Sequence, residues 1–257
     1  MLMDKLQNHP IEEAKLMGMG EPFLHPHFSK ITKKFKETFP AAKLISATNA
    51  QYLLTQNMVD SLKYIDMLYI SIDGAYENYE RFRPPGKWKK LISFLEDLQS
   101  VDRQGCNIVV NYTVSPGLVF DIPIIEDLAK KYNLGEVRLN LVQNWNEGES
   151  TTTRYTDEEL LFLDRYKGQI KGKAPWTWSD CFWVQNGFYC TVEGNVKVCC
   201  MNTAAKSLGN IFTHTPEEIF NSNQFKIIKI GCETDTPTSH CSSCSYKELS
   251  PLLKRYL

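Results

Sequence analysis

The chain has 257 residues, of which 42% are hydrophobic and 23% charged, and its formal net charge is −1. This composition excludes a disordered chain and a strongly basic nucleic-acid-binding protein, and the length allows one large domain or two smaller ones. No apolar run reaches the length of a membrane span, and the opening MLMDKLQNHP lacks the basic and apolar regions of a secretory signal. We therefore expect a cytoplasmic protein that binds neither membrane nor nucleic acid.

Five short apolar segments in the first part of the chain predict β-strands, at 14–19, 43–48, 66–72, 106–114 and 136–142. Apolar residues at helical spacing predict helices between them, over 28–39, 88–101 and 122–132. Alternating strands and helices are typical of an α/β protein with a parallel sheet or barrel. The strands carry apolar residues on both faces, which predicts that both faces are buried.

The pattern changes after residue 145. A polar stretch leads into a short helix at 157–164, and a hairpin with strands at 188–192 and 196–200 follows an aromatic-rich segment. A further helix is expected over 216–230, before a loop that carries cysteines. We divide the chain into an α/β domain (1–150), a linker with a short helix (151–175) and a small Cys-rich domain (176–257).

Polar residues follow three successive predicted strands, at the carboxyl ends where parallel α/β folds place their active sites. Glu21, in GMGEP, carries a carboxylate that can accept hydrogen bonds from an ammonium group. Ser71 and Asp73 alternate on one side of a strand, and a hydroxyl beside a carboxylate suits ribose hydroxyls. Ordinary strand–helix turns are the alternative. Arg83 either binds a carboxylate or pairs with Glu80 on the surface.

Two other polar groups are weaker candidates. His25 and His27 form an H-x-H pair that is more simply explained by local polar contacts at a helix start than by a metal site. Three residues near the end of the last predicted strand are candidate substrate contacts: Arg138, Asn140 and Asn144.

Seven of the eight cysteines lie between residues 181 and 244. Without an export signal, such a cluster indicates a metal or iron–sulfur site rather than disulfides. Cys241 and Cys244 form a C-x2-C pair, which can hold one metal ion or two adjacent irons. Zinc sites usually carry two such pairs, yet zinc stays an alternative. Cys106, in a predicted core strand, is expected to be inert, and three cysteines have no assigned role: Cys190, Cys200 and Cys232.

Taken together, these motifs resemble the radical S-adenosylmethionine (SAM) enzymes that carry a SPASM or twitch C-terminal domain. GMGEP resembles the family's GGEP motif, which holds the amino group of SAM, and TNA resembles T-N-G, with Ala50 in place of the glycine. SIDG resembles the segment that faces the ribose, and the stretch around Arg83 resembles an R-x-P-G motif. The resemblance implies a SAM site lined by Gly20, Glu21, Pro22, Thr48, Asn49, Ser71, Asp73 and Arg83.

The cysteine spacing resembles the SPASM pattern C-x9–15-G-x4-C, with Gly194 as its glycine, followed by C-x2-C. Ser250 and Lys254 stand where a full SPASM domain has further cysteines. The resemblance therefore implies one auxiliary [4Fe–4S] cluster, with a ligand set of Cys181, Cys199, Cys241 and Cys244. The implied fold is a partial (β/α)6 TIM-like barrel that lacks its first strand, joined to a small SPASM-like or twitch-like domain with a β-hairpin and a helix.

One departure from the family is large. Its C-x3-C-x2-C motif, which holds the cluster that cleaves SAM, should precede GMGEP, but the 17 residues before Gly18 contain no cysteine. We expect an N-terminally truncated chain that is inactive alone. The intact enzyme would reductively cleave SAM and abstract hydrogen from a peptide or small-molecule substrate, with an electron donor such as a flavodoxin or ferredoxin. The alternatives are a non-catalytic truncated homologue or a binding module stabilised by zinc or an iron–sulfur site.

Overall fold

A computed structural model of the chain describes residues 2–141, 155–170, 178–200, 205–242 and 244. The chain divides into two compact units, which are described separately here. The α/β unit contains His9–Val142 and Thr153–Lys171. The Cys-bearing unit contains Met1–Asn8, Gln143–Thr152 and Gly172–Leu257.

The α/β unit is built on one parallel sheet, whose strands are β1 (Glu13–Leu16), β2 (Lys43–Thr48), β3 (Met67–Ser71), β4 (Asn107–Val114) and β5 (Val137–Leu141). They pair in chain order, β1-β2-β3-β4-β5, and every neighbouring pair is parallel. Each strand coincides with one segment expected from the sequence, so the predicted α/β class with a parallel, barrel-like sheet is confirmed. Parallel pairing places the carboxyl ends of all the strands at one edge of the sheet.

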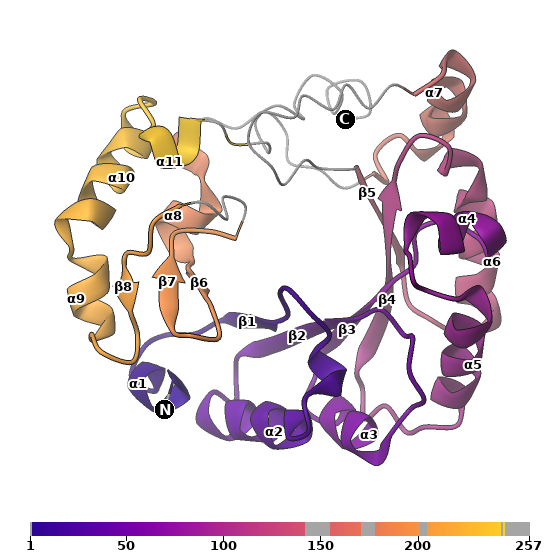
Figure 1. The fold of residues 1–257 in the computed structure, drawn as a ribbon, viewed down its shortest axis with the longest axis horizontal. Helices are drawn as coiled ribbons and strands as arrows, with labels where there is room; N and C mark the ends of the chain where they lie inside the picture. Colours follow the sequence, from indigo (N-terminus) through magenta and orange to yellow (C-terminus); the bar gives the residue numbers. More distant parts are fainter. Residues whose placement is uncertain (1, 142–154, 171–177, 201–204, 243, 245–257) are drawn as a thin grey trace. The chain divides into compact units, whose positions relative to one another are not determined.

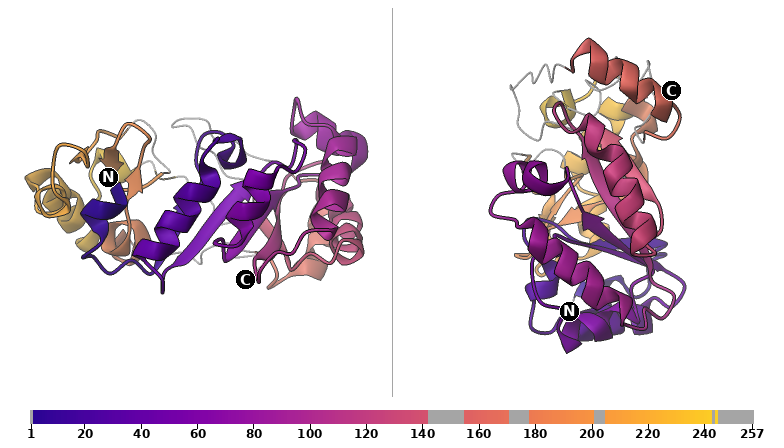
Figure 2. Two further views of the ribbon diagram at one scale, coloured as in Figure 1. Left: turned by 90° about the horizontal axis from the view of Figure 1, so that it is seen from below. Right: turned by 90° about the vertical axis from the view of Figure 1, so that its right-hand side faces the viewer.

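Helices connect the strands and lie along one face of the sheet (Figures 1 and 2). They are η1 (Pro22–Leu24), α2 (Phe28–Thr38), α3 (Gln56–Leu62), α4 (Tyr76–Phe82), α5 (Trp88–Gln99), η2 (Val119–Asp121), α6 (Ile122–Lys131), α7 (Asp157–Leu163) and η3 (Asp164–Tyr166). The sequence predicts α2, α5, α6 and α7. It misses α3 and α4, because each has seven residues and too few apolar positions to show a helical period.

The two faces of the sheet differ in burial. On the helix-covered face, side chains such as those of Leu68, Ile70 and Tyr112 are at most 1% exposed. On the opposite face, at the carboxyl half of the strands, the side chains are polar and half-buried, among them Tyr69, Ser71, Asn111, Thr113, Arg138 and Asn140. The expectation that both faces are buried is therefore wrong for this half, where alternating polar residues face an open side of the sheet.

The Cys-bearing unit has a small antiparallel sheet in the order β6-β7-β8. Its elements are α1 (Leu2–Leu6), η4 (Trp178–Asp180), α8 (Phe182–Asn186), β6 (Tyr189–Cys190), β7 (Asn195–Lys197), β8 (Gly209–Asn210), α9 (Pro216–Phe220), α10 (Asn223–Glu233) and α11 (Ser239–Ser242). The predicted hairpin corresponds to β6 and β7, with shorter strands. The helix expected over 216–230 is two helices, because α9 ends before Asn221 and Ser222 caps α10 by accepting a hydrogen bond from the Phe225 N–H at 3.2 Å.

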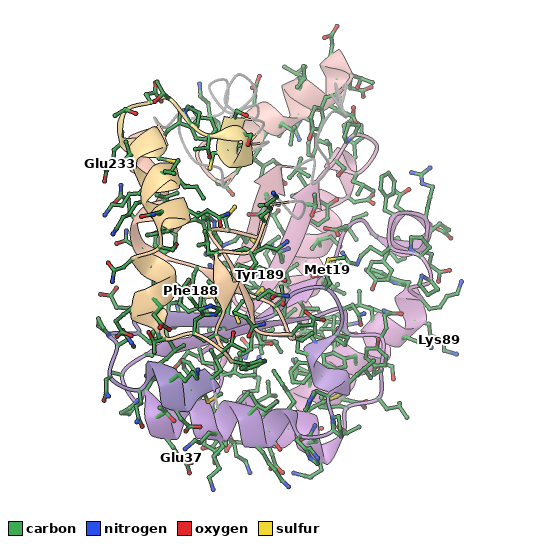
Figure 3. All side chains as sticks on the ribbon, turned by 60° about the vertical axis from the view of Figure 1, so that its left-hand side comes forward. Met19, Glu37, Lys89, Phe188, Tyr189 and Glu233 are labelled. Carbon is green, nitrogen blue, oxygen red and sulfur yellow. The ribbon has the colours of Figure 1, made fainter. Side chains whose placement is uncertain are left out.

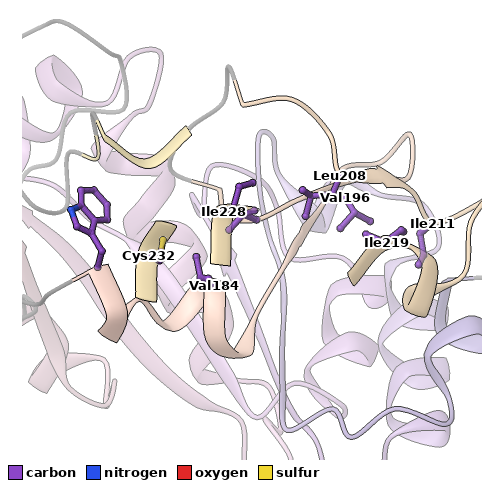
Figure 4. Packing of buried hydrophobic residues seen from close by; sticks show 9 residues of the cluster. Val184, Val196, Leu208, Ile211, Ile219, Ile228 and Cys232 are labelled. Atoms are coloured by element: carbon purple, nitrogen blue, oxygen red, sulfur yellow. The ribbon is translucent and has the colours of Figure 1, made fainter. Parts of the chain in front are cut away.

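Nine buried residues form the core of this unit: Trp178, Val184, Val196, Val198, Leu208, Ile211, Ile219, Ile228 and Cys232 (Figure 4). Gly194, in the turn between β6 and β7, has a φ of +84°, which is in the left-handed region. A Cβ on Gly194 would lie 2.5 Å from the Phe212 ring, so both conformation and space require glycine there.

In the described part of the chain, no helix is long and apolar enough to cross a bilayer.

Candidate functional site

The loop after β1 holds Glu21 in a fixed position. One carboxylate oxygen, Oε2, accepts a hydrogen bond from the Asn49 N–H at 2.8 Å, and the other, Oε1, accepts one from the Phe23 N–H at 3.3 Å. The second bond caps η1, which begins at Pro22. Gly20 has a φ of +126°, and a Cβ there would touch nothing, so its glycine is needed for conformation rather than space. Glu21 thereby links the loops that follow β1 and β2.

Burial raises the pKa of Glu21 above its ordinary value, although the hydrogen bonds from Asn49, Thr48 and Phe23 and the charge of Arg83 act against this shift. A buried carboxylate of this kind gains from a positively charged ligand. Met19, two residues before Glu21 on the same loop, is 97% exposed (Figure 3).

The loop after β2 is a tight turn stabilised by its own side chains. Thr48 Oγ1 accepts a hydrogen bond from the Ala50 N–H at 3.1 Å, and Asn49 Oδ1 accepts one from the Gln51 N–H at 3.1 Å. Ala50 is fully buried and has a φ of +55°, in the left-handed region. The residue that replaces the glycine of T-N-G thus adopts the conformation that favours glycine.

The segment after β3 places an ion pair next to this loop. Asp73 Oδ1 accepts a hydrogen bond from the Thr113 N–H at 2.6 Å, and its Oδ2 pairs with the Arg83 guanidinium. Both partners are largely buried, with 14% of the Asp73 side chain and 27% of the Arg83 side chain exposed. The expected alternative, a pair between Arg83 and Glu80, is wrong, because Glu80 pairs with Lys87 at 2.8 Å.

Two residues that the sequence analysis missed complete this group. The Tyr79 ring, on α4, is fully buried, and its hydroxyl accepts a hydrogen bond from Gln51 Nε2 at 2.8 Å. Tyr79 also lies close enough to Arg83 for the guanidinium to lower its pKa, which burial raises. Nothing in the sequence signals this contact, because Gln51 and Tyr79 are 28 positions apart and join only in the fold. The loops after β1, β2 and β3 thus form one connected polar site.

Polar side chains continue from this site across the half-buried face of the sheet. Arg138 lies over the Tyr69 ring, with 5.2 Å between the guanidinium carbon and the ring centroid, and donates a hydrogen bond to the Tyr69 hydroxyl. Asn140 Nδ2 donates to Asn111 Oδ1 at 2.9 Å. Asn144 lies outside the described residues. His25 and His27 use a local contact, in which His25 Nδ1 accepts a hydrogen bond from the His27 N–H at 3.2 Å.

The second candidate site is formed by thiols around the core of the Cys-bearing unit. None of the eight cysteines, all of which lie within the described residues, forms a disulfide. Cys232 is fully buried on α10, and the side chain of Cys241 on α11 is hydrogen-bonded to it. The hydrogen bond with Cys232 is the main reason that the pKa of Cys241 is raised, and burial is the second. The nearby thiols of Cys199 and Cys181 raise this pKa further. Those four thiols therefore lie within electrostatic reach of one another.

The same core contacts Cys181, Cys241 and Cys244. Among the described residues, no three Cys, His, Asp or Glu side chains converge as one metal ion requires. In a [4Fe–4S] cluster each thiolate binds a different iron, so the four thiolates stand further apart than the ligands of one zinc ion. The thiols that contact this apolar core are therefore candidate ligands for an iron–sulfur cluster. Burial raises the pKa of Cys106 to about 12, consistent with an inert core thiol.

Comparison with known proteins found one family model and several solved structures similar to this chain. Residues 181–245 match the SPASM family model, an iron–sulfur cluster-binding domain. Among solved structures, SuiB of Streptococcus suis bound to S-adenosylmethionine is 12% identical, with a TM-score of 0.66 over 96% of this chain and 63% of that chain. SuiB bound to the precursor peptide SuiA is 13% identical, with a TM-score of 0.67 over 96% and 62%. The structure of anSMEcpe with bound AdoMet is 14% identical, with a TM-score of 0.66 over 98% and 84%.

No curated protein sequence matches the chain. The chain spans 63% of the length of SuiB, and at these identities the structural matches establish the fold. Residues 181–245 therefore match the model of the SPASM iron–sulfur cluster-binding family, and the chain as a whole has the fold of the SuiB and anSMEcpe structures.

Proposed function

We propose that this protein is the SAM-binding and auxiliary-cluster part of a radical SAM/SPASM enzyme. The observation that carries the proposal is the group of thiols around one apolar core within the segment that matches the SPASM family. In this proposal Cys181, Cys199, Cys241 and Cys244 hold one [4Fe–4S] cluster. When bound, SAM supplies the hydrogen-abstracting chemistry and the cluster supplies a one-electron carrier, while the chain binds and orients both.

Glu21 is the residue that we propose for the ammonium group of SAM. Its two oxygens each accept one backbone hydrogen bond, and a carboxylate has further lone pairs available for a ligand. Because those backbone bonds fix the carboxylate before a ligand arrives, little conformational freedom is lost on binding. The exposed Gly20 backbone beside it allows the ligand to approach closely.

Asp73 and Ser71 are the residues that we propose for the ribose hydroxyls. Both lie at the end of β3 on the side of the sheet that is not covered by helices. Asp73 is held by the Thr113 N–H and by Arg83, and these two contacts fix the direction of its carboxylate. The half-buried polar face around Asn111, Asn140 and Arg138 is then the place for a substrate.

A peptide is the substrate class that the comparisons favour, since SuiB has been solved with the precursor peptide SuiA. The 257 residues contain no C-x3-C-x2-C triplet. In this proposal, reductive cleavage of SAM therefore requires thiolates from outside this sequence, together with an electron donor such as a flavodoxin or ferredoxin. The second candidate function is a binding module stabilised by zinc or an iron–sulfur site, in which the thiols that contact the core hold the metal.

The experiment is a measurement of iron, zinc and acid-labile sulfide per chain, on protein purified without oxygen. We expect about four iron and four sulfide. Cys241→Ser should lose most of this iron, whereas Cys190→Ser, the matched control in the same core, should retain it. One zinc and no sulfide would contradict the cluster and favour the binding module. Equal iron in Cys241→Ser and the wild-type protein would contradict the ligand set.

A further inference from the structure

One hydroxyl beside the cysteines has no partner. Thr238 Oγ1 is the single buried side-chain nitrogen or oxygen atom without a hydrogen bond in the described part of the chain. Buried hydroxyl groups are nearly always hydrogen-bonded, because leaving one unpaired costs the free energy of its lost hydration. An unpaired buried hydroxyl in a well-packed unit therefore indicates a partner that the polypeptide does not supply.

The backbone fixes where this hydroxyl is. The Thr238 carbonyl accepts hydrogen bonds from the N–H groups of Cys241 and Ser242, both at 2.9 Å, so Thr238 begins the helical turn that carries Cys241. On its other side Thr238 packs against α10, since a Cβ on Gly231 would lie 3.5 Å from Thr238 Cγ2. Gly231 is adjacent to Cys232, whose side chain contacts Cys241. Thr238 thus lies between two of the thiol-bearing elements.

A helix cap does not provide a hydrogen-bond partner for the Thr238 hydroxyl. A threonine just before a helix usually accepts a hydrogen bond from an N–H of the first turn through its side chain. Here the Cys241 N–H is already bound to the Thr238 carbonyl. The other two threonines of this loop satisfy each other, because Thr234 Oγ1 and Thr236 Oγ1 are 2.7 Å apart. Only the Thr238 hydroxyl is left to donate.

We propose that the Thr238 hydroxyl donates a hydrogen bond to a sulfide of the auxiliary cluster and raises the cluster's reduction potential. This inference rests on the proposed function. Reduction adds negative charge to the cluster sulfurs, and a hydrogen bond to sulfur stabilises the reduced form more than the oxidised form. Thr238 is therefore a positioning and tuning residue rather than a ligand.

The test compares Thr238→Val, which has the same shape without the hydroxyl, with Thr238→Ser, which keeps it. Thr236→Val is the control for removing a hydroxyl from the same loop. The full chain is loaded anaerobically, and iron and sulfide are measured before a redox titration followed by electron paramagnetic resonance. We expect Thr238→Val to retain its iron and to have a lower midpoint potential, with Thr238→Ser and Thr236→Val unchanged.

Pulsed electron paramagnetic resonance on the reduced wild-type protein gives a readout that needs no variant. We expect an exchangeable proton coupled to the cluster in the wild-type protein and in Thr238→Ser. An absent proton, or an unchanged midpoint potential in iron-loaded Thr238→Val, would overturn this inference alone. A wild-type protein without iron and sulfide would overturn the proposed function as well. If Thr238→Val cannot hold iron, Thr238→Ala and the wild-type proton signal decide the question.

Discussion

The two units of the molecule differ in how their buried polar groups are hydrogen-bonded. In the α/β unit, Glu21 and Asp73 are paired with backbone N–H groups and with Arg83 before any ligand binds. In the Cys-bearing unit, the side chain of Cys241 contacts another thiol, and the Thr238 hydroxyl has no partner. The first unit builds its own site from backbone and side-chain hydrogen bonds. The second unit leaves the Thr238 hydroxyl without a partner from the polypeptide.

The sizes of the two units agree with this difference. The parallel sheet has strands of four to eight residues covered by helices, whereas β6 and β8 have two residues each. Small units with short strands generally need disulfides or a metal to reach useful stability. We therefore expect the Cys-bearing unit to depend on its cluster for folding and the α/β unit to fold without a ligand.

The largest expected effect is that of iron removal. Binding of a structural metal contributes on the order of 10 kcal/mol to the folding of small metal-binding domains, so its loss should unfold the Cys-bearing unit. Hydrogen exchange measured by mass spectrometry should show lost protection in β7 and α10 after chelation. Protection in β3 and β4 should be unchanged. Equal protection of all four elements with and without iron would remove the proposed difference between the units.

Glu21→Gln tests the site of the α/β unit. A hydrogen bond between charged groups is worth roughly 1.5–3 kcal/mol, so SAM should bind about 10–100-fold more weakly to this variant in calorimetry. Because burial raises the pKa of Glu21, the wild-type carboxylate takes up its proton at a higher pH than an ordinary glutamate. SAM affinity of the wild-type protein should therefore fall as the pH falls through that raised value, and the variant should lack this step.

Glu80→Gln is the matched control, since Glu80 is a surface carboxylate paired with Lys87 in the same unit. It should bind SAM as the wild-type protein does. If both substitutions weakened SAM binding equally, the affinity for SAM would depend on the net charge of the unit and not on the Glu21 carboxylate.

Asp73→Asn tests how much the ion pair between Asp73 and Arg83 stabilises the α/β unit. The amide can still accept from the Thr113 N–H but leaves the partly buried Arg83 without its anion, which should cost about 1–3 kcal/mol in urea unfolding. Asp127→Asn removes a pair with Lys130 whose side chains are 78% and 77% exposed, and should cost less than about 0.5 kcal/mol. Similar losses in the two variants would contradict the importance of burial at Asp73.

Much of the fold could be predicted from the sequence because local patterns decide it. KLISAT predicts β2 to the residue, and the amphipathic spacing of α5 predicts its buried leucines. The division of residues 216–230 into two helices was missed although Ser222, a favoured capping residue, stands at the break. The half-buried sheet face was missed because Asn111 and Thr113 lie within a segment that is otherwise apolar.

The candidate site could be predicted in part. GMGEP, TNA and SIDG mark the loops after β1, β2 and β3, and the structure joins these loops by hydrogen bonds. The ion-pair partner of Arg83 was not predictable, because Asp73 and Glu80 are both near it in sequence. In the fold, Arg83 follows α4 and pairs with Asp73, whereas Glu80 pairs with Lys87. Cys232 had no assigned role because only the packing of α10 brings it to Cys241.

The smallest expected effect concerns Ala50. Its φ of +55° costs a non-glycine residue about 1 kcal/mol or more, whereas glycine adopts this conformation freely but loses more entropy on folding. The net result expected for Ala50→Gly is an increase of up to about 1 kcal/mol in the free energy of unfolding. Ala47→Gly in β2, where φ is negative, should instead destabilise by roughly 0.5–1 kcal/mol. Opposite signs in urea unfolding would show that the α/β unit keeps its loop in place despite local strain, through the hydrogen bonds that Thr48 and Glu21 accept from this loop. A loss in both variants would mean that the Ala50 methyl group, fully buried, contributes more by packing than its backbone costs.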